Sequence, residues 1–186
     1  TSAKKLKQMA GSKIAGPALD ALPCTDTGVV DGVPFRMGSV ELLPIHTPGH
    51  TDNHFAYFHA GRLYTGDALL IEACGRTDFQ SGDPAALYRS VRGKLFSYDD
   101  DTLVYPAHDY ERRRISTIGQ EKARNPRLGG ERTLEDFVAL MSSLKLAYPR
   151  FIDYALPGNR ECGTCPPGVP EHLQQYCTQI GESRQG

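Results

Sequence analysis

The sequence predicts an α/β (α+β) domain in which helices pack against a sheet. Strand-like apolar runs come first and strands then alternate with helices, which is the pattern of a layered sheet-and-helix domain. Three side chains that can bind a metal, those of His50, Asp67 and His108, each follow the end of a predicted strand. Loops at strand ends are where a rigid sheet presents a binding site. The length of 186 residues suits one domain, alone or with a short tail.

A helix and an antiparallel meander form the first part of the chain. Residues 2–10 have helical composition from the first position, and a loop-rich segment follows over residues 11–31. Asp31-Gly32, Gly38-Ser39 and Ala60-Gly61 are turn signals between mostly apolar runs. The predicted strands are residues 33–37, 40–45, 55–59 and 62–64.

Helices dominate the second part of the chain. Asp83 is a predicted N-cap, with Pro84 in the first helical position. Apolar residues then recur at spacings of four, so that one face of this helix lies on the sheet: Leu87, Val91 and Leu95. A short strand is predicted at residues 102–105. Further helices are predicted at residues 116–123, after a capping box at residues 133–136, and at residues 170–177.

Composition and charge exclude several classes of protein. The net charge is −1, and no basic stripe interleaved with aromatic residues is present, which argues against a nucleic-acid partner. The longest apolar run is only a few residues, so we expect no membrane span. The five cysteines are odd in number, and three lie in the last 25 residues. This is a poor disulfide framework and favours a reducing compartment, the cytoplasm or, in a eukaryote, the mitochondrial matrix.

Five side chains near the middle of the sequence could bind a metal: His46, His50, Asp52, His54 and Asp67. His50 and Asp67 are the predicted ligands, because each lies in a glycine-containing turn just past a strand end. His46 ends one strand and His54 opens the next, so packing in the core or at its rim is the favoured interpretation for both. Two imidazoles and one carboxylate with open positions are the arrangement that non-haem Fe(II) oxygenases use.

Several motifs resemble the metallo-β-lactamase superfamily and, within it, the persulfide dioxygenases. They are Thr47-Pro-Gly-His-Thr51, Thr65-Gly-Asp-Ala-Leu-Leu-Ile71, Cys74-Gly-Arg-Thr-Asp-Phe79, Tyr105-Pro-Ala-His-Asp-Tyr110, Asn125-Pro-Arg-Leu128 and Asn159-Arg-Glu-Cys-Gly163. The third motif is the specific one, and the resemblance covers roughly residues 33–163. It implies an αββα sandwich whose first strands are absent from this chain. We therefore expect residues 1–155 to be the C-terminal portion of a metallo-β-lactamase-fold domain and residues 156–186 to be a tail with a short helix.

One motif of the superfamily is absent from the sequence. No His-x-His-x-Asp-His run is present, and the six histidines lie at positions 46, 50, 54, 59, 108 and 172. In the family this run comes just before a helix, and residues 2–10 resemble that helix. We expect the chain to be the C-terminal portion of a longer protein, in which an upstream histidine completes the metal site.

The resemblance assigns an activity and a metal. It implies oxidation of glutathione persulfide by O2 to sulfite and glutathione, at one non-haem Fe(II) per chain. His50 and Asp67 would hold the iron together with the upstream histidine. His108 would lie outside the ligand set and orient the ligands.

The resemblance also places residues at the substrate. In the related glutathione thioester hydrolases (glyoxalase II), a basic residue after Cys-Gly and a tyrosine two residues past the histidine contact the glycine end of glutathione. Here these are Arg76 and Tyr110, and a guanidinium suits a terminal carboxylate. Thr51 is a further substrate-binding candidate. An ion pair with Asp78 is the competing explanation for Arg76. Cys74 has no base paired with it in sequence, so we expect a small buried residue in the wall of the site.

Alternatives to this interpretation stay open. A glyoxalase II-like hydrolase would use two metals and a metal-bound hydroxide, but it would need a separate helical domain after the sandwich. A catalytically inert fragment is the second alternative, because two of three iron ligands are present. The tail offers zinc-type ligands, with a reduced surface tail as the favoured interpretation: Cys162, Cys165, His172 and Cys177. The sequence does not give the oligomeric state, and a homodimer is among the options.

Overall fold

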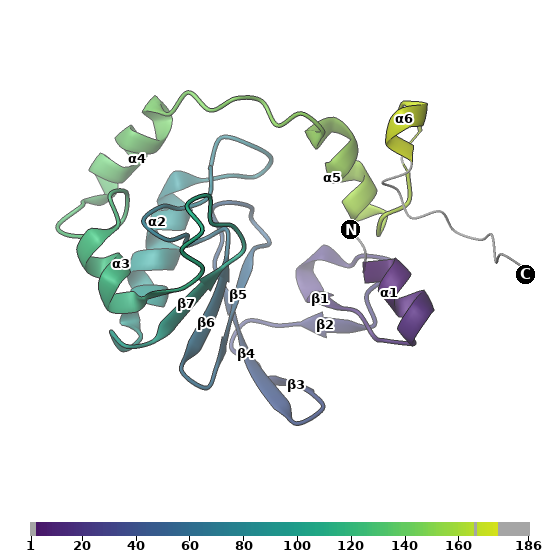
Figure 1. Ribbon diagram of the computed structural model, residues 1–186, viewed down its shortest axis with the longest axis horizontal. Coiled ribbons are helices and arrows are strands. Elements are labelled where there is room, and N and C mark those ends of the chain that lie inside the picture. The colour runs from purple at the N-terminus through teal and green to yellow at the C-terminus, as the bar shows by residue number, and fades with distance from the viewer. Residues whose placement is uncertain (1–2, 166, 175–186) are drawn as a thin grey trace, which may run out of the picture. The chain divides into compact units, whose positions relative to one another are not determined.

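The computed structural model describes residues 3–165 and 167–174 of the chain (Figure 1). These residues fall into two compact units. One unit is Val29–Lys145, and the other is formed by the two ends of the chain, before and after that segment. Across the described ranges, no helix is both long enough and apolar enough to cross a bilayer.

A six-stranded sheet forms the centre of the Val29–Lys145 unit. Its strands follow chain order, and all neighbours are antiparallel except β6 and β7, which are parallel. The strands are β3 (Phe35–Met37), β4 (Val40–His46), β5 (Phe55–His59), β6 (Arg62–Gly66), β7 (Leu103–Pro106) and β8 (Ser116–Thr117). The predicted strands are therefore confirmed. The first is shorter than expected, since Pro34 has no N–H group to donate to a ladder.

The parallel pair β6 and β7 determines where the site forms. Gly66 lies beside Pro106 in the register of the pair, so the loops that follow both strands begin at the same edge of the sheet. The buried Thr65 hydroxyl donates to the Leu69 carbonyl oxygen at 2.6 Å. This hydrogen bond closes the turn that carries Asp67.

Three helices cover one face of the sheet (Figure 1): α2 (Pro84–Gly93), α3 (Ile118–Arg124) and α4 (Leu134–Ser143). Asp83 caps α2 with Pro84 at its first position, as predicted. Thr133 and Asp136 form the predicted capping box of α4. The helix predicted at residues 116–123 begins only at Ile118, because residues 116–117 pair with β7 instead. A short 3-10 helix, η2 (Leu95–Ser97), follows α2.

The hydrophobic core lies between these helices and the sheet. The residues predicted to face the sheet from α2 and its end, Leu87, Val91 and Leu95, are all fully buried. They share one cluster with strand and helix residues, among them Leu63, Val104, Phe137 and Met141. Burying a side chain of this size contributes about 1.5–3 kcal/mol, so this layer anchors the loops at the sheet edge.

The other face of the sheet carries a row of tyrosines. Side chains alternate between the two faces along a strand, and Tyr64 lies opposite Tyr57 on one neighbour. On the other neighbour, Tyr105 stacks on Tyr64 with ring centroids 5.4 Å apart. Tyr64 is 40 % exposed.

The unit formed by the chain ends contains short elements. They are α1 (Ala3–Ala10), β1 (Ala15–Pro17), η1 (Ala18–Asp20), β2 (Thr27–Val29), α5 (Ile152–Arg160) and α6 (Glu171–Gln174). Strands β1 and β2 pair with each other. Helix α5 was not predicted, because Pro157 lies inside it and proline disfavours a helix interior. The last predicted helix is described only as far as Gln174.

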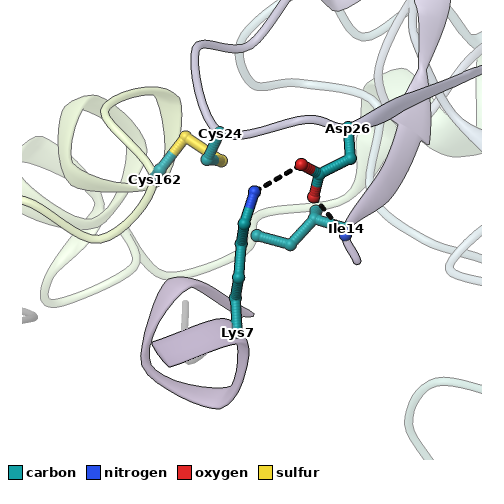
Figure 2. Close-up of a disulfide and its surroundings, with 5 residues drawn as sticks. All are labelled: Lys7, Ile14, Cys24, Asp26 and Cys162. Atoms are coloured by element: carbon teal, nitrogen blue, oxygen red, sulfur yellow. Dashed lines mark hydrogen bonds and ion pairs between the residues drawn. A yellow bond between two sulfur atoms is a disulfide. The ribbon is translucent and has the colours of Figure 1, made fainter. Parts of the chain in front are cut away.

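Within this unit a disulfide joins Cys24 to Cys162, with Cα atoms 6.0 Å apart (Figure 2). Beside it, Lys7 Nζ pairs with Asp26 Oδ1 at 2.5 Å, and the Ile14 N–H donates to Asp26 Oδ2 at 2.8 Å. The hydrogen bond from Lys7 holds the pKa of Asp26 below its usual value. These contacts connect α1 and the loop before β2 to the C-terminal part of the unit.

The disulfide corrects two expectations about the cysteines. The interpretation of all cysteines as reduced is wrong for Cys24, Cys162 and Cys165, which are all disulfide-bonded. A zinc site that includes Cys162 is excluded as well, because its sulfur is bonded to another sulfur and cannot act as a thiolate ligand. Cys177, the last of the zinc candidates, lies outside the described residues.

Candidate metal site

His50 lies in a turn after β4 that packs closely against α2. Gly49 has a φ of 137°, and a Cβ atom at this position would lie 2.3 Å from the Leu87 Cα atom. Only glycine allows this approach. The His50 Nδ1 atom lies 2.8 Å from the Arg76 carbonyl oxygen. Because a carbonyl oxygen only accepts, Nδ1 carries the proton, and Nε2 of the neutral ring presents a lone pair.

Asp67 follows β6, and its two carboxylate oxygens face different histidines. Oδ2 lies 3.8 Å from His50 Nε2. Oδ1 accepts a hydrogen bond from His108 Nδ1 at 2.6 Å. The structure thus brings His50, Asp67 and His108 together, as expected for loops at neighbouring strand ends.

His50 and Asp67 fit as two ligands of one metal ion. Metal–ligand distances of about 2.1 Å allow two donor atoms to lie up to about 4 Å apart around one ion, and the Nε2–Oδ2 distance is 3.8 Å. Among the residues that the structure describes, no group of three or more His, Cys, Asp and Glu side chains is arranged to hold a metal. The donor set of the described residues is therefore a pair.

The ring nitrogens of the two other histidines, His46 and His54, make hydrogen bonds within the protein. This agrees with the prediction that both side chains pack in the core or at its rim. The Asp67 N–H donates to His54 Nε2 at 3.1 Å, so the proton of His54 lies on Nδ1, 2.8 Å from Thr47 Oγ1. Burial lowers the pKa of His54 to about 4, which keeps the ring neutral near pH 7. His46 Nε2 lies 2.7 Å from the Asp52 carbonyl oxygen.

The loop of residues 74–79 is folded against both predicted ligands. A Cβ atom at Gly75 would lie 2.4 Å from the Asp67 carbonyl oxygen and 2.9 Å from His50 Nδ1. The Gly75 N–H donates to that same Asp67 oxygen at 2.8 Å, and the next residue, Arg76, supplies the carbonyl oxygen to His50. The most specific motif of the sequence is therefore the wall of the candidate site, and its glycine is required by the close approach to Asp67 and His50.

Cys74 is a small buried residue in this wall, as predicted. It is the free cysteine of the described chain and is 3 % exposed. Burial raises the pKa of its thiol to about 11, so the thiol stays protonated at neutral pH and is a poor nucleophile. Its carbonyl oxygen accepts a hydrogen bond from Arg127 Nη1 at 2.9 Å.

Arg76 forms an ion pair with Asp78, which the sequence indicated as the alternative to a role in substrate binding. Its Nε and Nη2 atoms each lie 2.7 Å from a carboxylate oxygen of Asp78. The guanidinium also lies 4.4 Å from the centre of the Phe79 ring. The side chain is 18 % exposed, so its outer part remains accessible.

The remaining substrate candidates lie in the loops beside the ligands. Tyr110 is 82 % exposed, and its ring is parallel to that of His108 with centroids 6.2 Å apart. The Thr51 carbonyl oxygen accepts the Gly49 N–H at 2.9 Å. Thr51 thus closes the turn that presents His50.

Polar residues that the sequence left without a role tie the site loops to α3. Glu121 is fully buried, and its carboxylate accepts from the Ser116 hydroxyl at 2.6 Å and the Glu72 N–H at 2.9 Å. Asn125 Nδ2 donates to the Ala73 carbonyl oxygen at 3.0 Å. The signal for Asn125 was present in the Asn125-Pro-Arg-Leu128 motif, whereas nothing in the sequence marks Glu121 as buried.

Comparison with known sequences gives one family and several relatives. Residues 3–108 match the family described as the metallo-beta-lactamase superfamily. The chain is 43 % identical over 144 residues to "Persulfide dioxygenase ETHE1, mitochondrial" of Homo sapiens, covering 76 % of this chain and 56 % of that protein. It is 35 % identical over 108 residues to a hydroxyacylglutathione hydrolase of Pseudomonas paraeruginosa, covering 56 % and 41 %. The chain spans about half the length of the curated relatives it matches.

Solved structures give a similar result. The crystal structure of ETHE1 from Myxococcus xanthus superimposes with a TM-score of 0.84 at 40 % identity, covering 88 % of this chain and 72 % of that one. A metallo-beta-lactamase from Staphylococcus aureus superimposes with a TM-score of 0.68 at 19 % identity, covering 78 % of this chain and 48 % of that one. The second likeness concerns the fold alone.

Proposed function

The chain belongs to the metallo-β-lactamase superfamily and, within it, to the ETHE1 group, and on this premise we propose that the whole protein is a persulfide dioxygenase. Glutathione persulfide, O2 and water would be its substrates, and sulfite and glutathione its products. The observation that supports this most is the loop of residues 74–79, which folds against His50 and Asp67 through Gly75 and the Arg76 carbonyl oxygen. This loop is the part of the sequence that most resembles the dioxygenases.

We propose Fe(II), one ion per chain, as the metal. His50 Nε2 and Asp67 Oδ2 would be two of its ligands, and a histidine outside the described residues would be the third. Imidazole and carboxylate with open positions are the donor set of mononuclear non-haem iron sites. When bound, the iron supplies the redox chemistry for O2 and the persulfide sulfur.

The chain's own residues would keep these ligands oriented. The Arg76 carbonyl oxygen holds the proton of His50 on Nδ1, which leaves Nε2 free. His108 donates to Asp67 Oδ1, so that Oδ2 remains directed toward His50. Hydrogen bonds of this kind fix the tautomer and direction of metal ligands.

Arg76, Tyr110 and Thr51 are the proposed substrate contacts. In the intact protein, we expect Arg76→Gln to retain iron and mainly to raise KM for glutathione persulfide. Losing one charge-assisted pair to a carboxylate costs about 1.5–3 kcal/mol, or roughly ten- to a hundredfold in kcat/KM. Steady-state O2 uptake measures this, with iron content determined in parallel.

Asp78→Asn is the matched control for Arg76→Gln. It removes the internal ion pair but keeps the guanidinium, so KM should stay near the wild-type value. Unchanged kinetics in Arg76→Gln, together with a loss of stability in both variants, would make Arg76 a structural partner of Asp78 only.

A glyoxalase II-like hydrolase with two metals is the alternative function. The partial match to hydroxyacylglutathione hydrolases favours it. In such an enzyme, His108 would bind the second metal directly. In this chain, its Nδ1 atom is bonded to the Asp67 carboxylate, which supports the orienting role that the dioxygenase proposal requires.

His108→Ala therefore tests the proposed function. If His108 orients Asp67, one iron per chain is retained, and sulfite formation falls about 10–100-fold, the range usual for partners of metal ligands. The measurements are metal per chain, O2 uptake on glutathione persulfide and hydrolysis of a glutathione thioester. Two zinc ions per wild-type chain with thioester cleavage, and loss of the second zinc ion and of the cleavage in His108→Ala, would establish the hydrolase instead.

We extend the proposal to the architecture and the location. The partly exposed row of Tyr57, Tyr64 and Tyr105 supports the idea that residues 1–155 are the C-terminal portion of a sandwich with a second sheet over this face, and residues 156–186 a tail. We propose the cytoplasm or, in a eukaryote, the mitochondrial matrix. The disulfide between Cys24 and Cys162 removes the cysteine argument for that location, which now depends on the mitochondrial relatives.

A further inference from the structure

We infer that Arg113 is a positioning residue, which fixes the loop that carries His108 to the loop that carries Asp67. Its Nη1 atom donates to Glu72 Oε2 at 2.8 Å, and Nη2 donates to the Ile71 carbonyl oxygen at 2.9 Å. Both acceptors belong to the loop that follows Asp67. One guanidinium thus reaches from the segment after β7 to the segment after β6.

The same guanidinium also holds its own loop. Nε and Nη2 donate to Asp109 Oδ1 at 3.1 and 3.0 Å, and the Arg113 backbone N–H donates to Asp109 Oδ2. The Asp109 side chain is largely buried and directly follows His108 in the chain. The loop after β6 and the loop after β7 are therefore joined by two sets of contacts. One is the 2.6 Å hydrogen bond between His108 and Asp67, and the other is formed by Arg113.

Arg113 is the middle one of three consecutive arginines, and its guanidinium is the one that contacts the neighbouring loop in the described structure. It lies between Arg112 and Arg114, which have left-handed φ values of 60° and 74°. Such conformations are unfavourable for residues other than glycine and persist where surrounding contacts hold them. Within the described ranges, neither Arg112 nor Arg114 makes a hydrogen bond or an ion pair. Only the central arginine is used.

Glu72 is held from two sides. Its carboxylate pairs with Arg113, while its N–H donates to the buried Glu121 at 2.9 Å, and its φ is 52°. Only a planar guanidinium has the forked donors to serve Glu72, Ile71 and Asp109 together, whereas a lysine is a single point charge. The geometry therefore requires arginine at position 113.

The purpose of this connection rests on the proposed function, since the orientation of Asp67 matters most if Asp67 is a metal ligand. The connection itself is a property of the chain and is tested without metal. In the chain of residues 1–186 labelled with 15N, the readouts are the His108 Nδ1–H resonance and the amide hydrogen exchange of residues 67–73 and 108–113. His108→Gln assigns the resonance.

We expect Arg113→Ala to abolish the His108 Nδ1–H resonance and to speed exchange in both loops about tenfold, the change that follows from losing a charge-assisted hydrogen bond. Arg113→Lys should restore the signal only in part. Arg112→Ala and Arg114→Ala are matched controls from the same tripeptide, and both should behave as wild type. In the intact protein, Arg113→Ala should keep its iron and KM, while kcat falls about tenfold.

An unchanged His108 resonance in Arg113→Ala, or equal effects in Arg112→Ala, would overturn the inference. If Arg113→Ala does not fold, Glu72→Gln removes one acceptor charge while keeping the shape. Unchanged exchange in both loops of that variant would then count against the inference. The two proposals can fail separately. If the wild-type protein does not oxidise persulfide but Arg113→Ala still alters the NMR signals, the role of Arg113 is upheld and the proposed function is rejected.

Discussion

Replacing Asp67 with alanine is expected to empty the metal site of the intact protein and to abolish its O2 consumption. The change removes the carboxylate whose Oδ2 atom lies 3.8 Å from His50 Nε2. It also leaves His108 Nδ1 without its acceptor at 2.6 Å. Iron per chain and O2 uptake on glutathione persulfide measure the result, and both should fall to background.

Asp52→Asn is the matched control for this experiment. Asp52 is an exposed acid of the same loop region, and the contacts it makes are through its backbone, to His46 and to the Ser81 hydroxyl. Its variant should keep iron and activity. Thermal unfolding of both variants shows whether they are folded. Full iron retention in a folded Asp67→Ala protein would show that Asp67 is not a ligand.

Breaking the disulfide between Cys24 and Cys162 is expected to have the largest effect on stability. The bond joins residues separated by 138 positions. In the chain-entropy account, removing a cross-link costs about 2–5 kcal/mol in the free energy of unfolding, with long loops at the upper end. Urea unfolding of Cys24→Ala, Cys162→Ala and the double variant measures it.

The double variant is the internal control for this prediction. Either single substitution removes the same bond. The free energy of unfolding of the double variant should therefore lie within about 0.5 kcal/mol of the values for the single variants. Effects that add would mean that the two cysteines contribute separately. If the two units unfold in separate transitions, only the one that contains α1 and α5 should shift.

Local signals explain which elements could be predicted from the sequence. The strand pairs follow from glycine-containing turns between apolar runs, and the capping of α2 by Asp83 follows from the Asp-Pro pair. The meeting of His50, Asp67 and His108 follows from a simple rule, because loops after neighbouring strands share one edge of the sheet. The turns and the helix cap needed only residues close together in sequence.

The features that could not be predicted depend on residues far apart in sequence, or on a distinction between residues of the same type. The disulfide pairs Cys24 with a partner 138 positions away, and spacing gives no sign of it. Helix α5 forms despite Pro157, so propensity argued against it. Residues 112–114 are three arginines of identical chemistry, and only the hydrogen bonds in the described structure distinguish Arg113 from its two neighbours.

The assignment of iron and of glutathione persulfide depends on resemblance more than on geometry. The two proposed ligands, His50 and Asp67, and the hydrogen bonds that orient them would suit several metals. The family motifs contributed the choice of iron and of glutathione, and the relatives, matched over about half of their length, are named persulfide dioxygenases.

Arg76 divides its roles between main chain and side chain, and this has a consequence for how the protein can evolve. Its carbonyl oxygen orients His50, and every amino acid carries such an oxygen. Its side chain is the proposed contact for the substrate. Substitution at position 76 therefore leaves the ligand geometry available to each new variant while the preference for the substrate's charge changes. The neighbouring Gly75, in contact with both proposed ligands, has no such freedom, so position 76 can change while position 75 stays glycine.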